Sequence, residues 1–346
     1  MANHLIEGTG SLLDGQGSLR EPGYALRPPF DYSHDAVAAP HWRIKDWDYY
    51  LISDDEYGVA LTFSDLGYIG LISASVLDFS AAGYKTTSEM VLFPMGKMGL
   101  PASSERGDIV WSNRRCSVTF AHQNGGRRLS FAMKNFEKGV DFEAELFLDK
   151  EPEDSMVIAT PWAEDPEAFY YNRKIIGMRA RGGFRLGQLF HEFDGDEALG
   201  LLDWGRGVWT YDNTWYWSAA MGYQEGRVIG FNLGYGFGDT SAASENILFV
   251  DGVGHKLGRV DFGIPRTEDG SPEYLKPWHI LDDEGRLDLT FTPSFDRVDY
   301  IDVAHLVTSD QHQVFGTFTG SAVLDDGKIL AIDGIKGFAE HVHNKY

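Results

Sequence analysis

Residues 58–64 read Gly-Val-Ala-Leu-Thr-Phe-Ser, and large and small side chains alternate along the whole stretch. Successive side chains of a β-strand point to opposite faces, so Val59, Leu61 and Phe63 would share a heavy face and the smaller residues a light one. The stretch therefore predicts a β-strand with two unlike faces, and it shows no helical periodicity.

Tight-turn signals recur between apolar runs further along the chain. Glycine, asparagine and aspartate adopt the left-handed backbone of a two-residue turn most easily. The turn pairs are Asn124-Gly125, Glu225-Gly226, Asp251-Gly252, Glu284-Gly285 and Asp326-Gly327. Because strand-forming residues flank each pair, they predict a series of β-hairpins.

Helical periodicity is scarce, and the best candidates are short turns near residues 165–170 and 188–191. With 40 glycines and many short strands, the chain is predicted to be all-β, of barrel or sandwich type, since closure removes exposed sheet edges. Its 346 residues exceed one ordinary domain. An acidic, proline-containing break within residues 151–162 suggests two packed halves, residues 1–155 and 156–346.

The composition argues against several classes of partner. A formal net charge of −22 repels phosphate backbones and anionic membrane surfaces, so we expect neither a nucleic-acid nor a membrane partner. The only cysteine, Cys116, cannot form an internal disulfide and suits a reducing compartment. The start, residues 1–4, has no basic segment followed by an apolar one, and no run of 18 apolar residues occurs. These features predict a cytoplasmic location.

Aromatic residues make up 14% of the chain and are densest within residues 202–217. In a continuous strand, one face of this stretch would carry Trp209, Tyr211, Asn213, Trp215 and Trp217. Such a wall serves either as a core packed against another sheet or as one side of a ligand pocket. Asn213 favours the pocket, because a buried amide needs hydrogen-bond partners that a dry core rarely supplies.

Four ionisable residues near this wall are candidates for chemistry. Asp203 and Arg206 stand on a glycine-punctuated bend and would form either a structural ion pair or a fixed acid beside a fixed cation. Glu245 lies between segments rich in Phe and Leu, where a carboxyl group tends to have the raised pKa of a general acid, unless it sits in a solvated turn. His255 would act as a base or bond a backbone carbonyl.

The remaining patterns give no sign of a metal or a cofactor. The glycines of residues 230–238 lack the Gly-Lys-Ser/Thr ending and the helix of a phosphate loop. His341 and His343 would face one way on a strand, but neither His312 nor another ligand is spaced to match. Neither a nucleophile elbow nor a dinucleotide fingerprint occurs. We therefore expect no metal and no cofactor.

Several specific motifs lie close together in the second half of the chain. They are residues 203–209 (Asp-Trp-Gly-Arg-Gly-Val-Trp), Trp215-x-Trp217, residues 232–239 (Asn-Leu-Gly-x-Gly-Phe-Gly-Asp), Glu245-Asn246 and residues 251–257 (Asp-Gly-x-x-His-Lys-Leu). This block, together with Trp47-x-Tyr49-Tyr50 near the start, resembles the bacterial family known as domain of unknown function 2804, over essentially the whole chain. More distantly, Gly334-x-x-Gly337-Phe338-x-Glu340 is similar to the ends of carotenoid hydratases, tocopherol cyclases and related lipocalin-like enzymes.

The resemblance implies a calycin-type fold. This means two packed lipocalin-like antiparallel β-barrels or half-barrels, with very few short helices and a ligand cavity between or inside them. The distant relatives act on polyenes, isoprenoids or steroid-like molecules by cofactor-free acid catalysis. No role of an individual residue carries over from them to this chain.

The leading hypothesis is a cofactor-independent lyase or isomerase that acts by acid catalysis on a small hydrophobic or amphipathic molecule. Asp203 or Glu245 would donate the proton, with His255 as a further catalytic candidate. The residues expected to hold the substrate are Arg206, Trp209, Tyr211, Asn213, Trp215, Trp217, Asn232 and Asn246. The alternatives are a non-catalytic lipocalin-like binding protein and a carbohydrate-active protein that uses paired carboxylates. Substrate identity and oligomeric state stay open.

Overall fold

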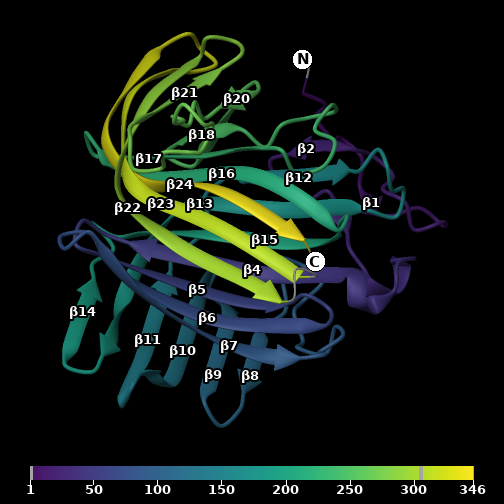
Figure 1. Cartoon of the computed structure of the whole chain (residues 1–346). Helices are drawn as coiled ribbons and strands as arrows, with labels where there is room; N and C mark the ends of the chain where they lie inside the picture. Colours follow the sequence, from purple (N-terminus) through teal and green to yellow (C-terminus); the bar gives the residue numbers. More distant parts are fainter. Residues whose placement is uncertain (1–2, 304–306, 346) are drawn as a thin grey trace.

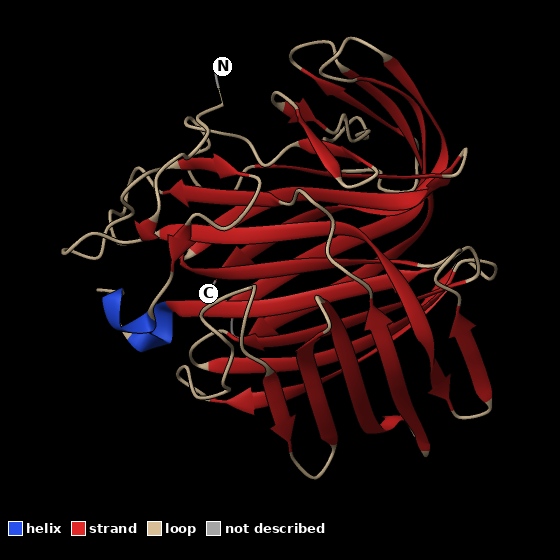
Figure 2. Cartoon of the chain, turned by 180° about the vertical axis from the view of Figure 1, so that it is seen from behind, coloured by secondary structure: helices blue, strands red, loops and turns tan. Residues whose placement is uncertain are grey.

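Strands form almost all of the regular structure of the chain (Figure 2). The computed structural model describes residues 3–303 and 307–345; Met1 and Ala2, part of the N-terminal segment considered above, lie outside the described residues. Within this range the helices are two short 3-10 turns, η1 (His34–Ala36) and η2 (His41–Arg43). The predicted all-β class is therefore confirmed.

The first of two curled antiparallel sheets holds thirteen of the described strands. They are β2 (Gly23–Ala25), β4 (Ile44–Ser53), β5 (Tyr57–Asp65), β6 (Ile69–Asp78), β7 (Gly83–Leu92), β8 (Ile109–Ser112), β9 (Cys116–Gln123), β10 (Gly126–Glu137), β11 (Val140–Leu148), β12 (Met156–Pro161), β13 (Phe169–Leu186), β14 (Leu189–Phe193) and β15 (Leu199–Val208). The main path is β7-β6-β5-β4-β15-β13-β11-β10-β9-β8, and β1 (Gly10–Ser11) pairs with β3 (Phe30–Asp31) separately.

The second sheet holds nine described strands. They are β16 (Asp212–Gln224), β17 (Arg227–Tyr235), β18 (Ile247–Val250), β19 (Val253–Lys256), β20 (Val260–Asp261), β21 (Trp278–Asp282), β22 (Leu287–Val303), β23 (Val307–Val323) and β24 (Ile329–Lys345). Their order is β19-β18-β17-β16-β24-β23-β22-β21-β20. Figure 1 shows the long strands β22, β23 and β24, coloured yellow-green to yellow, passing across the middle of the first sheet.

Three hydrophobic clusters hold the fold together: one inside each curled sheet and one between the two sheets. Val59, Leu61 and Phe63 all belong to the cluster inside the first sheet, whereas Ala60 belongs to the cluster between the sheets. The alternation predicted for residues 58–64 is thus confirmed in β5. Burial of one such large side chain contributes roughly 1.5–3 kcal/mol, and the light face of β5 is turned towards the second sheet.

All five predicted turns connect paired strands. Asn124 and Gly125, with φ of 53° and 78°, form the two-residue turn between β9 and β10. The pairs at residues 225–226 and 251–252 have the same left-handed backbone, and those at 284–285 and 326–327 lie in longer connections. Local turn chemistry therefore predicted these hairpins correctly.

The two predicted helical segments are wrong. Residues 165–168 form a turn in which Ala168 N donates to the Asp165 carbonyl at 3.0 Å and Asp165 Oδ1 accepts from Glu167 N, also at 3.0 Å, and β13 begins directly afterwards. Residues 189–191 belong to β14, which folds back on β13. In both places a tight turn into a strand produces the short apolar spacing that suggested a helical turn.

The chain passes from one sheet to the other at residues 209–211. Strands β12 to β15, which cover residues 156–208, belong to the first sheet, and β16 opens the second. The change of sheet at residues 209–211 is a different boundary from the predicted division of the chain between residues 155 and 156. That division stays a prediction. Among the described residues, neither helical turn has the length or the apolar character that a membrane-spanning helix requires.

Candidate functional site

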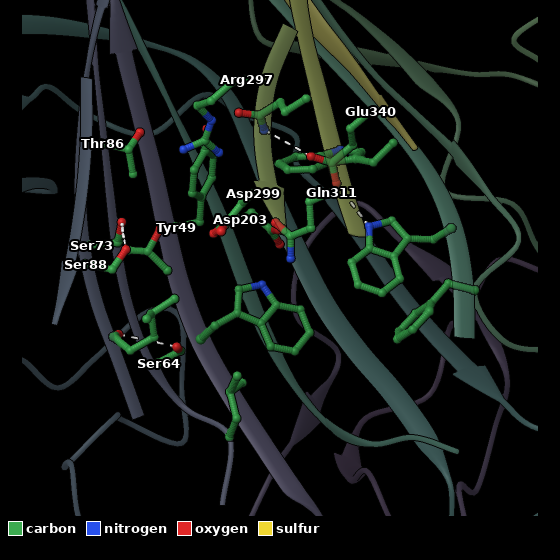
Figure 3. A pocket seen from close by; sticks show the side chains of 18 of the residues that line it. Tyr49, Ser64, Ser73, Thr86, Ser88, Asp203, Arg297, Asp299, Gln311 and Glu340 are labelled. Carbon is green, nitrogen blue, oxygen red and sulfur yellow. Dashed lines mark hydrogen bonds between the residues drawn. The ribbon is translucent and has the colours of Figure 1, made fainter. Parts of the chain in front are cut away.

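A cavity of about 470 Å³ lies between the two sheets. Strands β4–β7, β13 and β15 line one side, strands β16 and β22–β24 line the other, and Phe237 and Glu245 reach it from the connection between β17 and β18. Figure 3 shows Ser73 and Ser88 on one side of the cavity and Glu340 on the opposite side. The register of both sheets determines which side chains meet at this place.

One row of directly opposed residues in the first sheet, called the first row here, runs along the cavity. Across β13, β15, β4, β5, β6 and β7 its members are Lys174, Asp203, Tyr49, Thr62, Ser73 and Ser88. All six line the cavity. Since neighbouring strands lie roughly 4.8 Å apart, the wall changes from an ion pair to a series of hydroxyl groups over a few strand widths.

The facing row of the second sheet, called the second row, consists of Arg297, Gln313, Glu340 and Trp217 on β22, β23, β24 and β16. All four line the cavity. The next position in the row is Gly234 on β17, where a Cβ atom would overlap Oε1 of Glu245. The missing side chain therefore leaves room for the Glu245 carboxyl group.

The two rows meet at Lys174. Its Nζ lies 2.8 Å from Oδ1 of Asp203 and 3.9 Å from the centre of a Trp217 ring. Asn172 Nδ2 donates to the same Asp203 oxygen at 2.5 Å. Lys174 and Asp203 are both buried. Hydrogen bonds and a cation–π contact offset part of the cost of removing these two charges from water.

Glu340 is a buried carboxyl group that lines the second-sheet side of the cavity. Trp215 Nε1 donates to its Oε1 and Gln313 Nε2 donates to its Oε2, both at 3.0 Å. Burial raises the pKa of Glu340 to about 7, in spite of these two hydrogen bonds and of the nearby charges of Lys174 and Arg297. Near neutral pH this carboxyl group is therefore present in both its protonated and its ionised form.

Glu245 is held by Asn232. Asn232 Nδ2 donates to the backbone oxygen of Glu245 at 2.8 Å and to its Oε2 at 3.3 Å, while Asn232 Oδ1 accepts from Trp217 Nε1 at 2.7 Å. Burial raises the pKa of Glu245 as well. Asn232 thus connects Glu245 to Trp217, and Trp217 lies directly opposite Glu340 on the neighbouring strand.

The carboxyl groups of the cavity share two neighbours, Tyr170 and Lys174. These carboxyl groups belong to Asp203, Glu245 and Glu340. Burial, followed by the charges of Glu245, Asp203 and Glu340, raises the pKa of Tyr170 well above its ordinary value. Lys174 is paired with Asp203 and also acts on the charges of Glu245 and Glu340. Protonation of a carboxyl group relieves the excess negative charge, so the cluster is suited to hold a transferable proton.

Aromatic rings close the rest of the cavity around Phe237. Its ring makes edge contacts with Tyr170, Trp215 and Trp209 at centre distances of 5.0, 5.2 and 5.4 Å. Trp47 stacks on Tyr170 at 5.9 Å. These side chains give the cavity an apolar end that suits a flat ring.

Five of the predicted site residues line this cavity: Asp203, Glu245, Trp209, Trp215 and Trp217. They do not reach it as one strand, because Trp209 follows β15 and the other two tryptophans lie on β16. The prediction of a continuous strand through residues 209–217 is therefore wrong. Asn232 lies behind the wall, against Trp217 and Glu245.

Arg206 lies on the opposite face of β15 from Asp203, because three positions along a strand reverse the direction of the side chain. It is fully buried, and its Nη2 lies 3.0 Å from Oδ1 of Asp48. Its remaining donors bond the carbonyl oxygens of Trp47, Pro101 and Gly205. The structure thus places Arg206 in the packing of the first sheet, away from the cavity.

Tyr211 and Asn213 also lie outside the cavity lining. Tyr211 is 54% exposed and belongs to the passage between the sheets. Asn213 is buried, and its Oδ1 accepts from Trp162 Nε1 at 3.2 Å and from Thr210 Oγ1 at 3.1 Å. Its partners are protein groups, so the buried amide is satisfied without a pocket.

His255 and Asn246 are placed near the edge of the second sheet. Nδ1 of His255 lies 3.2 Å from Oδ2 of Asp325, on the far side of β18 from the cavity wall. Asn246 accepts from Gly234 N at 2.6 Å and donates to the Gly258 carbonyl at 2.8 Å, which fixes the loop that carries Glu245.

Among residues 3–303 and 307–345, no group of three His, Cys, Asp or Glu side chains is arranged to hold a metal ion. The histidines singled out in the sequence have other partners. His341 Nδ1 lies 2.7 Å from the Tyr274 hydroxyl, His343 Nε2 lies 2.8 Å from Asp212, and His312 Nδ1 lies 2.6 Å from Asp296.

Sequence reasoning missed Lys174, Glu340, Tyr49 and the hydroxyl groups of the first row as site residues. A signal for Glu340 was present, since it lies two positions beyond Phe338 and therefore on the same strand face. Tyr49 likewise shares a face with Trp47. For Lys174 the signal was its place in a strand whose neighbouring positions are largely aromatic or aliphatic.

Three solved structures illustrate what this chain is similar to. A protein provisionally assigned as AttH from Nitrosomonas europaea has a TM-score of 0.55 at 13% identity, over 90% of this chain and 94% of that chain. Kievitone hydratase from Nectria haematococca has a TM-score of 0.46 at 12% identity, over 87% and 88%. CghA has a TM-score of 0.42 at 7% identity, over 98% and 97%. At 13% identity, the first comparison shows a similar fold and nothing about activity. The other two TM-scores are below 0.5, and nothing about this chain is concluded from them.

No curated protein matches the chain. The comparison with family models agrees with the resemblance seen in the motifs around residues 203–257. One model, described as a domain of unknown function, matches residues 3–346. The chain therefore belongs to this family, DUF2804.

Proposed function

We propose that this chain is a cofactor-independent enzyme of the lyase or isomerase type, which protonates a small hydrophobic or amphipathic substrate between its two sheets. Glu340 is the general acid in this proposal. The observation that carries it is a cavity-lining carboxyl group whose pKa is raised by burial to about 7. A carboxyl group of ordinary pKa would be almost fully ionised at neutral pH and would have little proton to donate.

The proposed step is an addition of a proton to a carbon–carbon double bond. The electron pair of the double bond forms the new bond to the Glu340 proton, and the second carbon becomes electron-deficient. In a hydration, water bonds to that carbon and its surplus proton returns to a carboxylate. In an isomerisation, a neighbouring carbon instead loses a proton to the carboxylate. Each route restores the acid without an oxidant or a reductant.

The other residues of the cavity support this step in distinct ways. The rings of Trp215 and Trp217 would stabilise the developing positive charge by about 0.5–2 kcal/mol each. Asp203, paired with Lys174, adds a fixed negative charge nearby. Asn232 is a positioning residue for Glu245, the second carboxyl group able to exchange a proton. Arg206, Tyr211, Asn213, Asn246 and His255 have no part in the proposed step.

Glu340→Gln tests the proposal. Wild type and variant are incubated with a cellular small-molecule extract in D2O or in H2(18)O, and mass spectrometry identifies compounds that gain a label only when protein is present. We expect wild type to label a product and Glu340→Gln to slow labelling by about 100-fold or more. The wild-type kcat/KM should fall as pH rises through about 7, because the acid must be protonated.

Glu143→Gln is the matched control, since Glu143 is exposed on β11 and outside the cavity lining. It should keep the wild-type rate. Retained labelling by Glu340→Gln would exclude Glu340 as the acid, and loss of labelling in Glu245→Gln alone would transfer that role to Glu245. A ligand that copurifies with every variant but never gains a label would favour a binding protein without catalysis.

The cellular setting belongs to the same proposal. We infer a cytoplasmic enzyme with a small-molecule partner and no nucleic-acid partner. The single cysteine and the net charge of −22 support this inference.

A further inference from the structure

We propose that the substrate carries a neutral, hydroxyl-rich group, such as a sugar or polyol, bound between the outer part of the first row and the side chains of Gln313 and Arg297. This inference rests on the proposed function and names its substrate class. The apolar part of the same molecule would lie at the aromatic end of the cavity, within reach of Glu340.

The hydroxyl groups of the first row follow one another across three strands. Thr62, Ser73 and Ser88 are direct neighbours on β5, β6 and β7, and all three line the cavity. Ser88 Oγ donates to Ser73 Oγ at 3.0 Å. A hydroxyl group has one donor and two acceptor positions, so Ser73 still has a proton to donate and Ser88 still has oxygen lone pairs. The row therefore offers alternating donors and acceptors at strand spacing.

Complementary groups lie on the second sheet. Arg297 Nη1 donates to Ser75 Oγ at 2.8 Å, which brings β22 over the hydroxyl-bearing part of β6. Arg297 Nε and Gln313 Oε1 have no hydrogen-bond partner among the described residues. One is a donor and the other an acceptor. A ligand hydroxyl can satisfy either, whereas an alkyl chain would leave both unsatisfied.

The charges of the cavity favour a neutral group over an anionic one. Its lining contains four acidic residues, Asp203, Glu245, Asp299 and Glu340, and two basic ones, Lys174 and Arg297. Lys174 is already paired with Asp203. A carboxylate or phosphate would meet excess negative charge, while hydroxyl groups bring none.

The difference in exposure between the two ends of the first row indicates how the ligand is oriented in the cavity. Ser88 is exposed on β7, the edge strand of the first sheet, whereas Lys174 and Asp203 at the other end are buried. The hydroxyl-rich group would thus lie towards the open edge. The ring system would lie towards Trp217 and Glu340, where the proposed protonation takes place.

Three probes with one ring system test this inference by isothermal titration calorimetry: 2-naphthyl β-D-glucoside, 2-naphthol and 2-naphthoate. We expect the glucoside to bind at least about tenfold more tightly than the other two, the difference that two or three added uncharged hydrogen bonds support. Equal or tighter binding of 2-naphthol would overturn the inference. So would tightest binding of 2-naphthoate, which would indicate an anion site at Arg297.

Substitutions in the first row test whether its hydroxyl groups bind the glucose part of the glucoside. Thr62→Val and Ser73→Ala should each weaken glucoside binding by about three- to tenfold and leave 2-naphthol binding unchanged. Ser117→Ala, at an exposed position of β9 outside the lining, should change neither. Valine suits a strand, so Thr62→Val decides the question should Ser73→Ala fail to fold. Because no turnover is measured, a negative result here leaves the Glu340→Gln result intact.

Discussion

At the scale of single residues, Lys174 determines whether the acids of the cavity can be buried together. It is the cation paired with Asp203, and it lowers the cost of charge on Glu245 and Glu340. A buried ion pair contributes little net stability, because desolvation opposes the attraction of its charges. Loss of one partner strongly destabilises the fold, since the other partner is then left charged and buried.

Lys174→Met should lower the free energy of unfolding by about 3–5 kcal/mol, because it leaves the buried Asp203 carboxylate without its cationic partner. The double variant Lys174→Met/Asp203→Asn should recover most of that loss. Urea denaturation followed by circular dichroism measures both. As a control, Arg128→Met breaks the exposed pair with Glu145 and should cost less than about 1 kcal/mol. A double variant as unstable as Lys174→Met would contradict the assignment.

At the scale of elements, strand β15 separates a structural face from a cavity face. Asp203 and Gly205 lie on the cavity face, and Trp204 and Arg206 on the face towards the core of the first sheet. A Cβ atom at Gly205 would overlap the ring of Trp47 on the neighbouring strand β4. The glycine therefore lets an aromatic wall of the cavity pack directly on the strand that carries Asp203.

Gly205→Ala should destabilise the fold by about 1–3 kcal/mol, because the Trp47 ring must move in a packed wall. It should also weaken binding of 2-naphthol, since Trp47 stacks on Tyr170 at the apolar end. Denaturation curves and calorimetric titration test the two effects. Gly83→Ala serves for comparison, because the nearest atom to its Cβ would lie at 3.9 Å. Equal behaviour of both variants would show that Gly205 has no special role.

At the scale of the whole molecule, two curled sheets enclose carboxyl groups in a space that neither sheet forms alone. The first row and the second row come from different sheets, and Glu245 comes from a loop between strands of the second. Burial of acids in this interface couples stability to pH. The folded state holds the Glu340 proton more tightly than an unfolded chain does, because burial raises the pKa of Glu340 from 4.5 to about 7.

The contribution of Glu340 to stability is present at pH below about 4.5 and is lost as the pH rises to about 7. Relative to Glu340→Gln, the wild type should therefore become less stable across this range, by at most about 3 kcal/mol. Urea denaturation at pH 5, 6, 7 and 8 measures the difference. Glu143→Gln should show no such trend against wild type. A constant difference between wild type and Glu340→Gln would mean that the carboxyl group titrates normally.

Part of the site could be predicted from the sequence, and part could not. Asp203, Glu245 and three tryptophans were found because aromatic density and apolar surroundings are local properties of residues 202–250. Arg206 was misplaced because the glycines around it indicated a bend, whereas the structure continues β15 through them. Had residues 199–208 been interpreted as a strand, alternation would have placed Asp203 and Arg206 on opposite faces.

The all-β class, the hairpins and the two faces of β5 could be predicted from local sequence, because alternation and turn geometry depend on neighbouring residues. Which side chains share the cavity depends instead on contacts between distant parts of the chain. Asp203 is placed beside Tyr49, and Glu340 beside Trp217, by the pairing of strands distant in sequence. Such register follows from how whole strands pack, and a shift of one residue would turn every one of these side chains to the other face.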